Sequence, residues 1–215
     1  MQEIITFIME IIGTIAFAAS GAMVGVGRRM DIFGVCVLGV VTSVGGGMIR
    51  DIVLGIIPPG MFQKPVYTIV ATATSCVVFW VLYLKKELVE GHFREIYDRF
   101  MLIMDTIGLG IFTVVGVNTG IRHGYMDNTF LLVFVGTITG VGGGLLRDMM
   151  AGVPPYIFVK HIYACASIVG AVVCVYMYRS FGTVAAMVGA SAVVFLIRYL
   201  AARYRWNLPR LKRED

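Results

Sequence analysis

The chain has 215 residues, of which 58% are apolar and only 14% are charged. Soluble domains carry about a quarter charged residues, and disordered chains are poor in apolar ones, so the composition argues against both classes. The net charge of +5 does not indicate nucleic-acid binding, because the basic residues lie in loops and a tail between long apolar runs.

Apolar segments long enough to cross a bilayer recur along the whole chain. A transmembrane helix needs about 20 apolar residues. Seven segments meet this length, at about 4–27, 32–55, 65–84, 100–121, 129–151, 160–178 and 181–201. We therefore predict an all-α polytopic membrane protein with seven transmembrane helices. The first segment is expected to be retained, because Met1-Gln2-Glu3 lacks the basic region of a signal peptide.

Basic residues are distributed unequally between the two sides of this topology. Thirteen of them lie on the side of the C-terminus, and three, Lys64, Arg122 and Arg179, lie on the other side. Since cytoplasmic loops carry the excess of lysine and arginine, we predict that the N-terminus is outside and the C-terminus is cytoplasmic. The basic tail is typical of an anchor at an anionic inner leaflet.

Two motifs of the same form, G-G-G-x-x-R-D, stand in the second and fifth segments. The stretch from Val44 to Pro58 matches the stretch from Val141 to Pro155 at eight of fifteen positions. The match continues into the preceding segments, where Glu10 corresponds to Asp105, and such self-similarity indicates an internal repeat.

Each repeat holds three segments, and because three is odd, the second copy enters the membrane from the opposite side. We therefore predict two inverted three-helix repeats, in residues 1–92 and 93–180. A seventh helix and a basic cytoplasmic tail follow in 181–215.

The three consecutive glycines of each motif allow two interpretations. Small residues let helices pack closely, but glycine also permits a helix to break and expose backbone carbonyls and amides. A break is tolerated only inside protein or along a watery cavity, so we expect the broken helices to line a pathway for a small solute or ion. The residues expected to line it are Thr42, Ser43, Gly45, Gly46, Gly47, Arg50, Asp51, Thr139, Gly142, Gly143, Gly144, Arg147 and Asp148.

Each arginine of the motifs needs a partner. Neighbouring helical residues point about 100° apart, so the adjacent aspartates are not expected to neutralise Arg50 and Arg147. Glu10 lies at the depth of Arg50, and Asp105 lies at the depth of Arg147. We therefore predict the pairs Glu10–Arg50 and Asp105–Arg147, which either belong to a functional site or only lock the helices together.

Lys64 and His161 occupy equivalent positions at the starts of the third and sixth segments. Each is expected either at a mouth of the pathway or as an interfacial anchor, since long basic side chains reach toward the membrane surface.

No catalytic or metal-binding motif stands out. The sequence contains no H-E-x-x-H, G-x-S-x-G or G-x-x-x-x-G-K pattern. The four cysteines lie singly in apolar segments without a C-x-x-C pair, as expected for packing residues. We therefore expect no enzymatic activity, no metal and no cofactor.

The motifs resemble those of a known family, the bacterial proteins with two glycine-transporter domains, related to the trimeric intracellular cation (TRIC) channels. The resemblance rests on E-x-x-G-T-x-A-F-A-x-S-G-A from Glu10, R-x-D-x-F-G-V from Arg29, and both G-G-G-x-x-R-D motifs. It implies a seven-helix protomer in the bacterial inner membrane, a homotrimer, and one pathway in each protomer, lined by the glycines of kinked second and fifth helices. The lysine-glutamate-valine motif of the animal channels is not evident.

Three functions remain open. A monovalent-cation channel, for potassium, would use exposed carbonyls and hydroxyls as ligands of a dehydrated ion. A carrier for glycine or a similar small amino acid would use backbone amides for the carboxylate and carbonyls for the ammonium group. A non-transporting membrane scaffold would leave the buried charges without a purpose. The expected partners are the permeating cation or amino acid, the lipid bilayer and further copies of the chain, but no nucleic acid.

Overall fold

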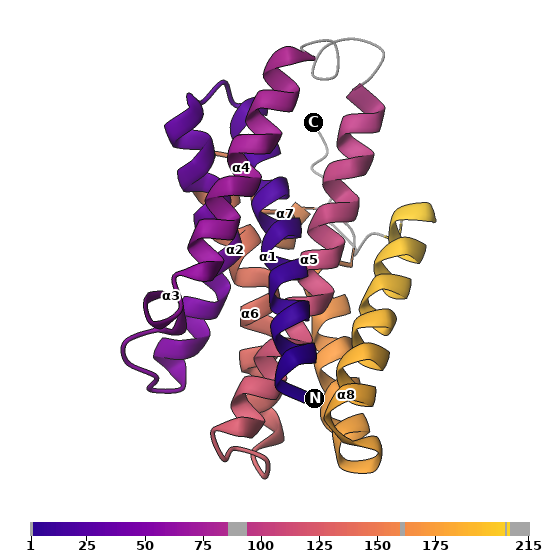
Figure 1. The fold of residues 1–215 in the computed structure, drawn as a ribbon. Helices are drawn as coiled ribbons and strands as arrows, with labels where there is room; N and C mark the ends of the chain where they lie inside the picture. Colours follow the sequence, from indigo (N-terminus) through magenta and orange to yellow (C-terminus); the bar gives the residue numbers. More distant parts are fainter. Residues whose placement is uncertain (1, 86–93, 160–161, 205, 207–215) are drawn as a thin grey trace.

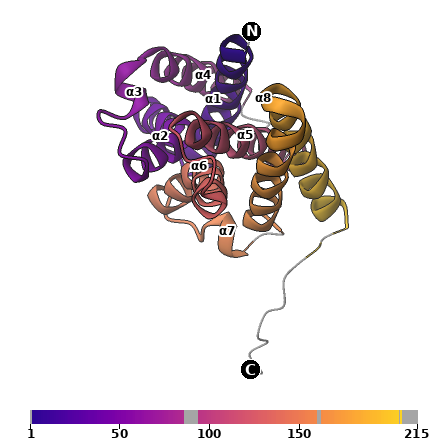
Figure 2. The ribbon, with the colours of Figure 1, turned by 90° about the horizontal axis from the view of Figure 1, so that it is seen from below.

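The computed structural model describes residues 2–85, 94–159, 162–204 and 206. Its helices in order are α1 (Gln2–Gly27), α2 (Ile32–Val53), α3 (Gly60–Gln63), α4 (Val66–Leu84), α5 (Arg94–Arg122), α6 (Thr129–Met150), α7 (Tyr156–Val159) and α8 (Ala164–Arg203). The long helices pack side by side in one bundle (Figures 1 and 2). We call the end of the bundle at which α1 begins and α5 ends the amino-terminal end (Figure 1).

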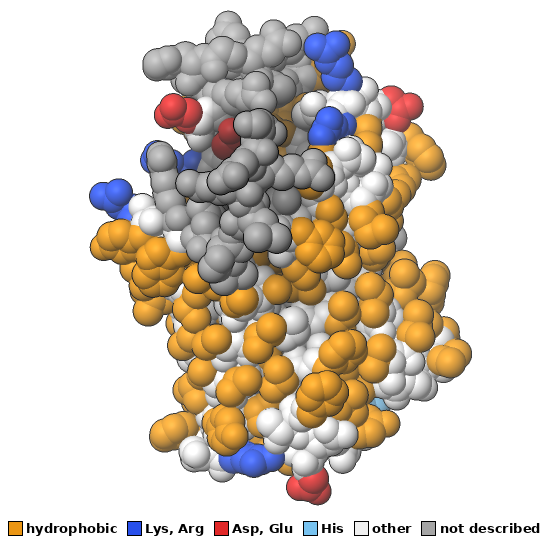
Figure 3. All heavy atoms as spheres, turned by 180° about the vertical axis from the view of Figure 1, so that it is seen from behind, with side chains coloured by type: hydrophobic (Ala, Val, Ile, Leu, Met, Phe, Trp, Pro, Cys, Tyr) orange, Lys and Arg blue, Asp and Glu red, His pale blue; other side chains and the backbone are white. Residues whose placement is uncertain are grey.

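An apolar band is visible on one face of the bundle (Figure 3), and all its long helices carry exposed apolar side chains. Six of the described helices, α1, α2, α4, α5, α6 and α8, are long and apolar enough to cross a membrane. Figure 3 shows hydrophobic side chains gathered over the middle of one face and charged side chains near its two ends. Large side chains in the band face outward, including Trp80 and Tyr176, which are 52% and 59% exposed. Soluble monomers rarely expose so large an apolar surface, and an all-helical membrane protein explains it.

The last two predicted segments form one helical element of 40 residues, α8. Its backbone leaves the helical conformation at Gly182, with φ 78° and ψ 179°. Glycine adopts a positive φ at little cost because it has no Cβ atom. Figure 1 shows α8 running toward the amino-terminal end and then turning back. The change of direction therefore lies at Gly182, slightly after the boundary we predicted between residues 178 and 181.

Helix α5 is longer than predicted. We expected a span from residue 100, but α5 begins at Arg94, so Glu95 and Arg99 lie in the helix rather than in a loop. Arginine and glutamate favour helices, so a charged segment can continue α5 beyond its apolar span.

The glycine triplets do not break α2 or α6, contrary to our prediction. Both helices remain α-helical through their triplets, which lie where the two helices touch. A Cβ atom on Gly46 would collide with the backbone carbonyl of Thr139, and one on Gly143 would collide with the carbonyl of Thr42. The triplets therefore serve close packing of α2 against α6, which is the other interpretation of the motif.

Equivalent contacts join the two halves of the chain. The ring of Phe112 lies against Gly13, and the ring of Phe17 lies in the same way against Gly108. The two rings are 5.3 Å apart between centroids, where α1 meets α5. The repeat of the sequence is thus also a repeat of packing contacts.

Helices α2 and α6 end in the same way. Gly55 follows α2 with φ 72°, and Gly152 follows α6 with φ 64°. At the end of α2, the N–H of Ile56 donates to the carbonyl of Asp51 at 2.8 Å, and the corresponding bond after α6 is 3.0 Å. This is a Schellman motif, which requires the left-handed backbone that glycine adopts readily. The chain turns sharply after each R-D pair and passes back beside the aspartate.

Cys36 and Cys76 lie close together, although each stands alone in its own apolar segment of the sequence. Their Sγ atoms, on α2 and α4, are 3.5 Å apart, and both residues are half-buried. A disulfide needs about 2.05 Å between the sulfur atoms, so the two sulfurs are near enough to make a bond between them testable.

We expect oxidation by oxygen with copper-phenanthroline to join Cys36 to Cys76 within one chain. Alkylation followed by intact-mass measurement should then count two fewer free thiols than in the reduced protein. Cys76→Ser should abolish this loss, whereas Cys165→Ser should not change it. Retention of all free thiols in the oxidised protein would contradict the packing of α2 against α4.

Candidate functional site

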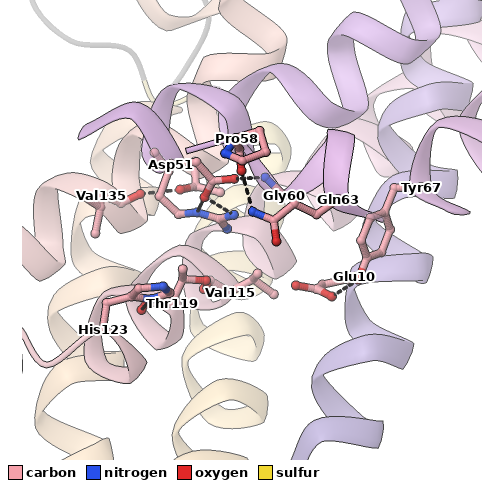
Figure 4. Close-up of polar contacts among 12 residues, drawn as sticks. Glu10, Asp51, Pro58, Gly60, Gln63, Tyr67, Val115, Thr119, His123 and Val135 are labelled. Carbon is pink, nitrogen blue, oxygen red and sulfur yellow. Dashed lines mark hydrogen bonds and ion pairs between the residues drawn. The ribbon is translucent and has the colours of Figure 1, made fainter. Parts of the chain in front are cut away.

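A cavity of about 450 Å³ lies between the helices in the amino-terminal half of the bundle. Helices α1, α2, α4 and α5 and the segment between α2 and α4 form its walls. Its lining includes the exposed residues Lys64, Arg122 and His123, so it is open to the surroundings at the amino-terminal end. We call it the amino-terminal cavity. Figure 4 shows the polar side chains around it.

Glu10 contributes a carboxylate to the amino-terminal cavity. The hydroxyl of Tyr67, on α4, donates a hydrogen bond to Glu10 Oε2. The two side chains point toward each other from neighbouring helices (Figure 4). The predicted Glu10–Arg50 ion pair does not form in this structure, because Arg50 is held by another acid. The charge of Glu10 therefore faces a neutral partner.

Arg50 pairs with the aspartate next to it in the sequence. Its Nε donates to Asp51 Oδ1 at 2.8 Å, and its Nη2 lies 2.7 Å from the same oxygen. The other carboxylate oxygen, Oδ2, accepts from the backbone N–H of Gly60 at 2.7 Å. Our expectation that neighbouring residues do not pair was wrong, because the long arginine side chain bends back along its own helix.

Arg147 repeats this arrangement in the second half. Its Nε donates to Asp148 Oδ1 at 2.8 Å, and Asp148 Oδ2 accepts from the backbone N–H of Tyr156 at 2.8 Å. In addition, Arg147 Nη1 donates to Asp105 Oδ1 at 2.6 Å and to Ser20 Oγ at 2.7 Å. The structure therefore contains the predicted Asp105–Arg147 pair. We call Ser20, Asp105, Arg147 and Asp148 the buried charge cluster.

Equivalent residues of the two halves differ in their exposure and in their bonding partners. The side chain of Arg50 is 13% exposed and borders the amino-terminal cavity, whereas the side chain of Arg147 is 1% exposed. Asp105 is fully buried and bonded to Arg147. Glu10 is half-buried and bonded to Tyr67 instead of to an arginine. The molecule is thus open on the side of Arg50 and sealed on the side of Arg147.

Only part of the predicted lining faces the amino-terminal cavity. Predicted site residues that line it are Glu10, Ser43, Gly47, Arg50, Asp51 and Lys64. Thr42 and Thr139 instead donate to carbonyls of their own helices, Leu38 and Val135. Gly45, Gly46, Gly142 and Gly143 lie buried where α2 meets α6. Gly144, Arg147 and Asp148 belong to the sealed half, and His161 lies outside the described residues.

A tyrosine lies near the acid of each half, and our sequence analysis did not identify either one as a site residue. Tyr67 lies beside Glu10, and Tyr163 Oη lies beside Gly144 close to Asp105. The two tyrosines stand 96 residues apart, as do Pro58 and Pro154. Continuing the repeat past the prolines would have identified them as equivalent site residues.

Metal binding has no visible basis in the parts of the chain that are described. Within them, no group of three or more histidine, cysteine, aspartate or glutamate side chains is placed to hold a metal ion.

Comparison with known proteins agrees with the repeat. The family described as glycine transporter matches the chain twice, at residues 7–83 and 102–179. The inner membrane protein YadS of Escherichia coli K12 is 38% identical over 205 residues, which is 94% of this chain and 93% of that protein. The membrane protein YvgT of Bacillus subtilis 168 is 30% identical over 204 residues, 94% of either chain.

Solved structures of TRIC channels have the same fold. The TRIC channel orthologue from Rhodobacter sphaeroides shares 30% identity and a TM-score of 0.84, over 94% of this chain and 99% of that one. A prokaryotic TRIC channel crystallised in 0.5 M KCl shares 31% identity and a TM-score of 0.85, over 96% and 100%. The chain therefore belongs to the glycine transporter family of membrane proteins, and its fold is that of the TRIC cation channels.

Proposed function

We propose that each chain forms a channel for monovalent cations, with potassium as the permeating ion. The amino-terminal cavity is its entrance, and the buried charge cluster is its gate. The structural relatives described above are TRIC channels, which supports a channel over a scaffold.

The charge of Glu10 is the observation that carries this proposal. Three basic side chains line the amino-terminal cavity. Arg50 pairs with Asp51, Arg122 lies 2.9 Å from Glu3, and Lys64 is exposed at the mouth. Glu10 accepts a hydrogen bond from a tyrosine and pairs with no basic side chain among the described residues, so its carboxylate is available to an entering cation. A negative charge in a cleft with low-dielectric walls raises the local concentration of cations.

The second half of the chain, which holds Arg147, closes the pathway in this proposal. Arg147 bonds to Asp105, Asp148 and Ser20, which come from α5, α6 and α1. These bonds tie three helices together around a buried guanidinium group and close the space between them. In this conformation a cation that enters the cavity meets a sealed end. Conduction requires the Arg147–Asp105 pair to separate.

A carrier of glycine is the second candidate. Glu10 and Arg50 both line the amino-terminal cavity, so an acid and a base are available for the ammonium and carboxylate groups of a zwitterion. The description of the family favours this alternative. The pairing of Arg50 with Asp51 weakens it, because a substrate carboxylate would compete with that bond.

We place the protein in the bacterial inner membrane, where YadS is found. The basic residues support an external N-terminus and a cytoplasmic C-terminus. In this proposal the two parts of α8 on either side of Gly182 each cross the membrane, which gives seven spans and two inverted repeats. Three copies of the chain assemble into a trimer, with one pathway in each copy.

Liposomes containing the purified protein test the proposal. With a potassium gradient, we expect a diffusion potential reported by a voltage-sensitive dye and no saturable uptake of labelled glycine. Glu10→Gln should reduce the potassium flux several-fold, because it removes the charge that attracts the ion. Saturable glycine exchange without a diffusion potential would instead identify a carrier.

A further inference from the structure

Arg198 is a buried arginine with unused hydrogen-bond donors. It lies on α8 and is 2% exposed. Its guanidinium group stacks over the ring of Tyr163, with Cζ 4.8 Å from the ring centroid. Within the described part of the chain, its Nε and Nη1 have no hydrogen-bond partner. A buried charge with free donors is costly unless an acceptor is available in some state of the protein.

A carboxylate oxygen with unused acceptor capacity lies near the hydroxyl of the same tyrosine. Asp105 uses Oδ1 for Arg147, but its buried Oδ2 accepts no hydrogen bond from the described residues. A Cβ atom placed on Gly144 would lie 3.0 Å from Tyr163 Oη and 3.8 Å from Asp105 Oδ1. Tyr163 therefore contacts Arg198 with its ring, while its hydroxyl lies near Asp105.

The first half of the chain has no counterpart of Arg198. The repeat matched by the family ends at residue 179, and Arg198 lies beyond it. At the equivalent acid, Glu10, the carboxylate is bonded to Tyr67, and among the described residues no arginine pairs with it. The additional arginine thus accompanies only the sealed half.

We propose that Arg198 is a positioning residue for the gate, the second partner of Asp105. When Arg147 separates from Asp105, it keeps Asp148 as its partner, but Asp105 would be left as a buried carboxylate without a positively charged partner. Arg198 then donates to Asp105, so the acid exchanges one arginine for another. This inference rests on the proposed function, because it assigns the means by which the proposed gate opens.

Single-channel recording of Arg198→Met tests the exchange. Methionine fills much of the space without a charge, so the open state loses its ion pair. We expect the open probability to fall about tenfold, the usual effect of losing a hydrogen bond to a charged group. The unitary conductance should not change, because Arg198 does not line the entrance. Arg198→Lys should restore much of the open probability.

Adding Arg198→Met to a chain that already carries Asp105→Asn distinguishes the exchange of arginine partners from a purely structural role of Arg198. Without the carboxylate there is nothing to exchange, so Arg198→Met should have no further effect on open probability. A tenfold fall in that background as well would overturn the proposal, as would an unchanged open probability in the single variant. The thermal unfolding midpoint should stay within the range of the wild type, since an apolar replacement of a buried charge is often neutral.

A second readout does not depend on conduction. In a chain whose native cysteines are replaced by alanine, Ser20→Cys places a thiol at the buried charge cluster. Its modification by a membrane-impermeant methanethiosulfonate measures how often the cluster opens, and Arg198→Met should slow it about tenfold. An unchanged rate would overturn the exchange. An absence of potassium current with a slowed rate would contradict the channel function but not the exchange.

Discussion

Replacing Gly46 with alanine should prevent the chain from forming stable protein, whereas the same change at Gly47 should be tolerated. A Cβ atom on Gly46 would collide with the backbone carbonyl of Thr139, which cannot move without separating α2 from α6. At Gly47 the nearest atom is Arg50 Nη2, at 3.7 Å, which is ordinary contact. Overpacking costs about 1–3 kcal/mol when side chains can adjust, and a backbone collision costs more.

Thermal unfolding in detergent, followed by size-exclusion chromatography, measures this difference. Gly46→Ala and Gly143→Ala should give aggregated protein or a much lower unfolding midpoint. Gly47→Ala should match the wild type, because alanine is also the better helix former by about 1 kcal/mol. If all three variants behaved alike, the triplet would act as a hinge rather than as a packing surface.

Asp105→Asn should open the proposed gate. The bond between Asp105 and Arg147 is 2.6 Å long, and both side chains are 1% exposed or less. Asparagine has nearly the same shape but no charge, and Arg147 still has Asp148 as its partner. Since a hydrogen bond between charged groups contributes about 1.5–3 kcal/mol, we expect the potassium flux into liposomes to rise at least about tenfold.

Glu10→Gln is the matched control, because it makes the same change at the equivalent position of the first half. Glu10 holds no arginine, so this variant should not raise the flux and should lower it instead. A rise of similar size in both variants would mean that the two halves are equally closed. A lack of any rise in Asp105→Asn would place the gate elsewhere.

The repeat allowed much of the fold to be predicted from the sequence. Apolar length indicated the helices, and the twin motifs placed α2 and α6 in equivalent roles. The position of Asp105 relative to Arg147 was also predictable, because the repeat and the depth of each residue bring them to the same level. Glycine triplets, in contrast, are compatible with packing and with a break, and only the opposing carbonyls of Thr42 and Thr139 decide between them.

The differences between the two halves could not be predicted from the sequence. Glu10 and Asp105 are equivalent in the repeat, so the same reasoning predicted an arginine partner for both. A repeat in the sequence does not tell which half is open, since one half can rearrange while the other does not. Arg198 is one of the thirteen basic residues that we assigned to the cytoplasmic side. Its burial could not be predicted, because it depends on how α8 folds back at Gly182.

Access to Gly47 from the two faces of the membrane tests the central claim most directly. The claim is that the amino-terminal cavity is the conducting pathway and ends at the buried charge cluster. Gly47 lines the cavity and has room for a side chain. In a chain without native cysteines, Gly47→Cys should react with an impermeant thiol reagent from the amino-terminal face, and the potassium flux should fall. From the opposite face it should react only after Asp105→Asn is added. Reaction from the opposite face without that change, or reaction that leaves the flux intact, would contradict the claim.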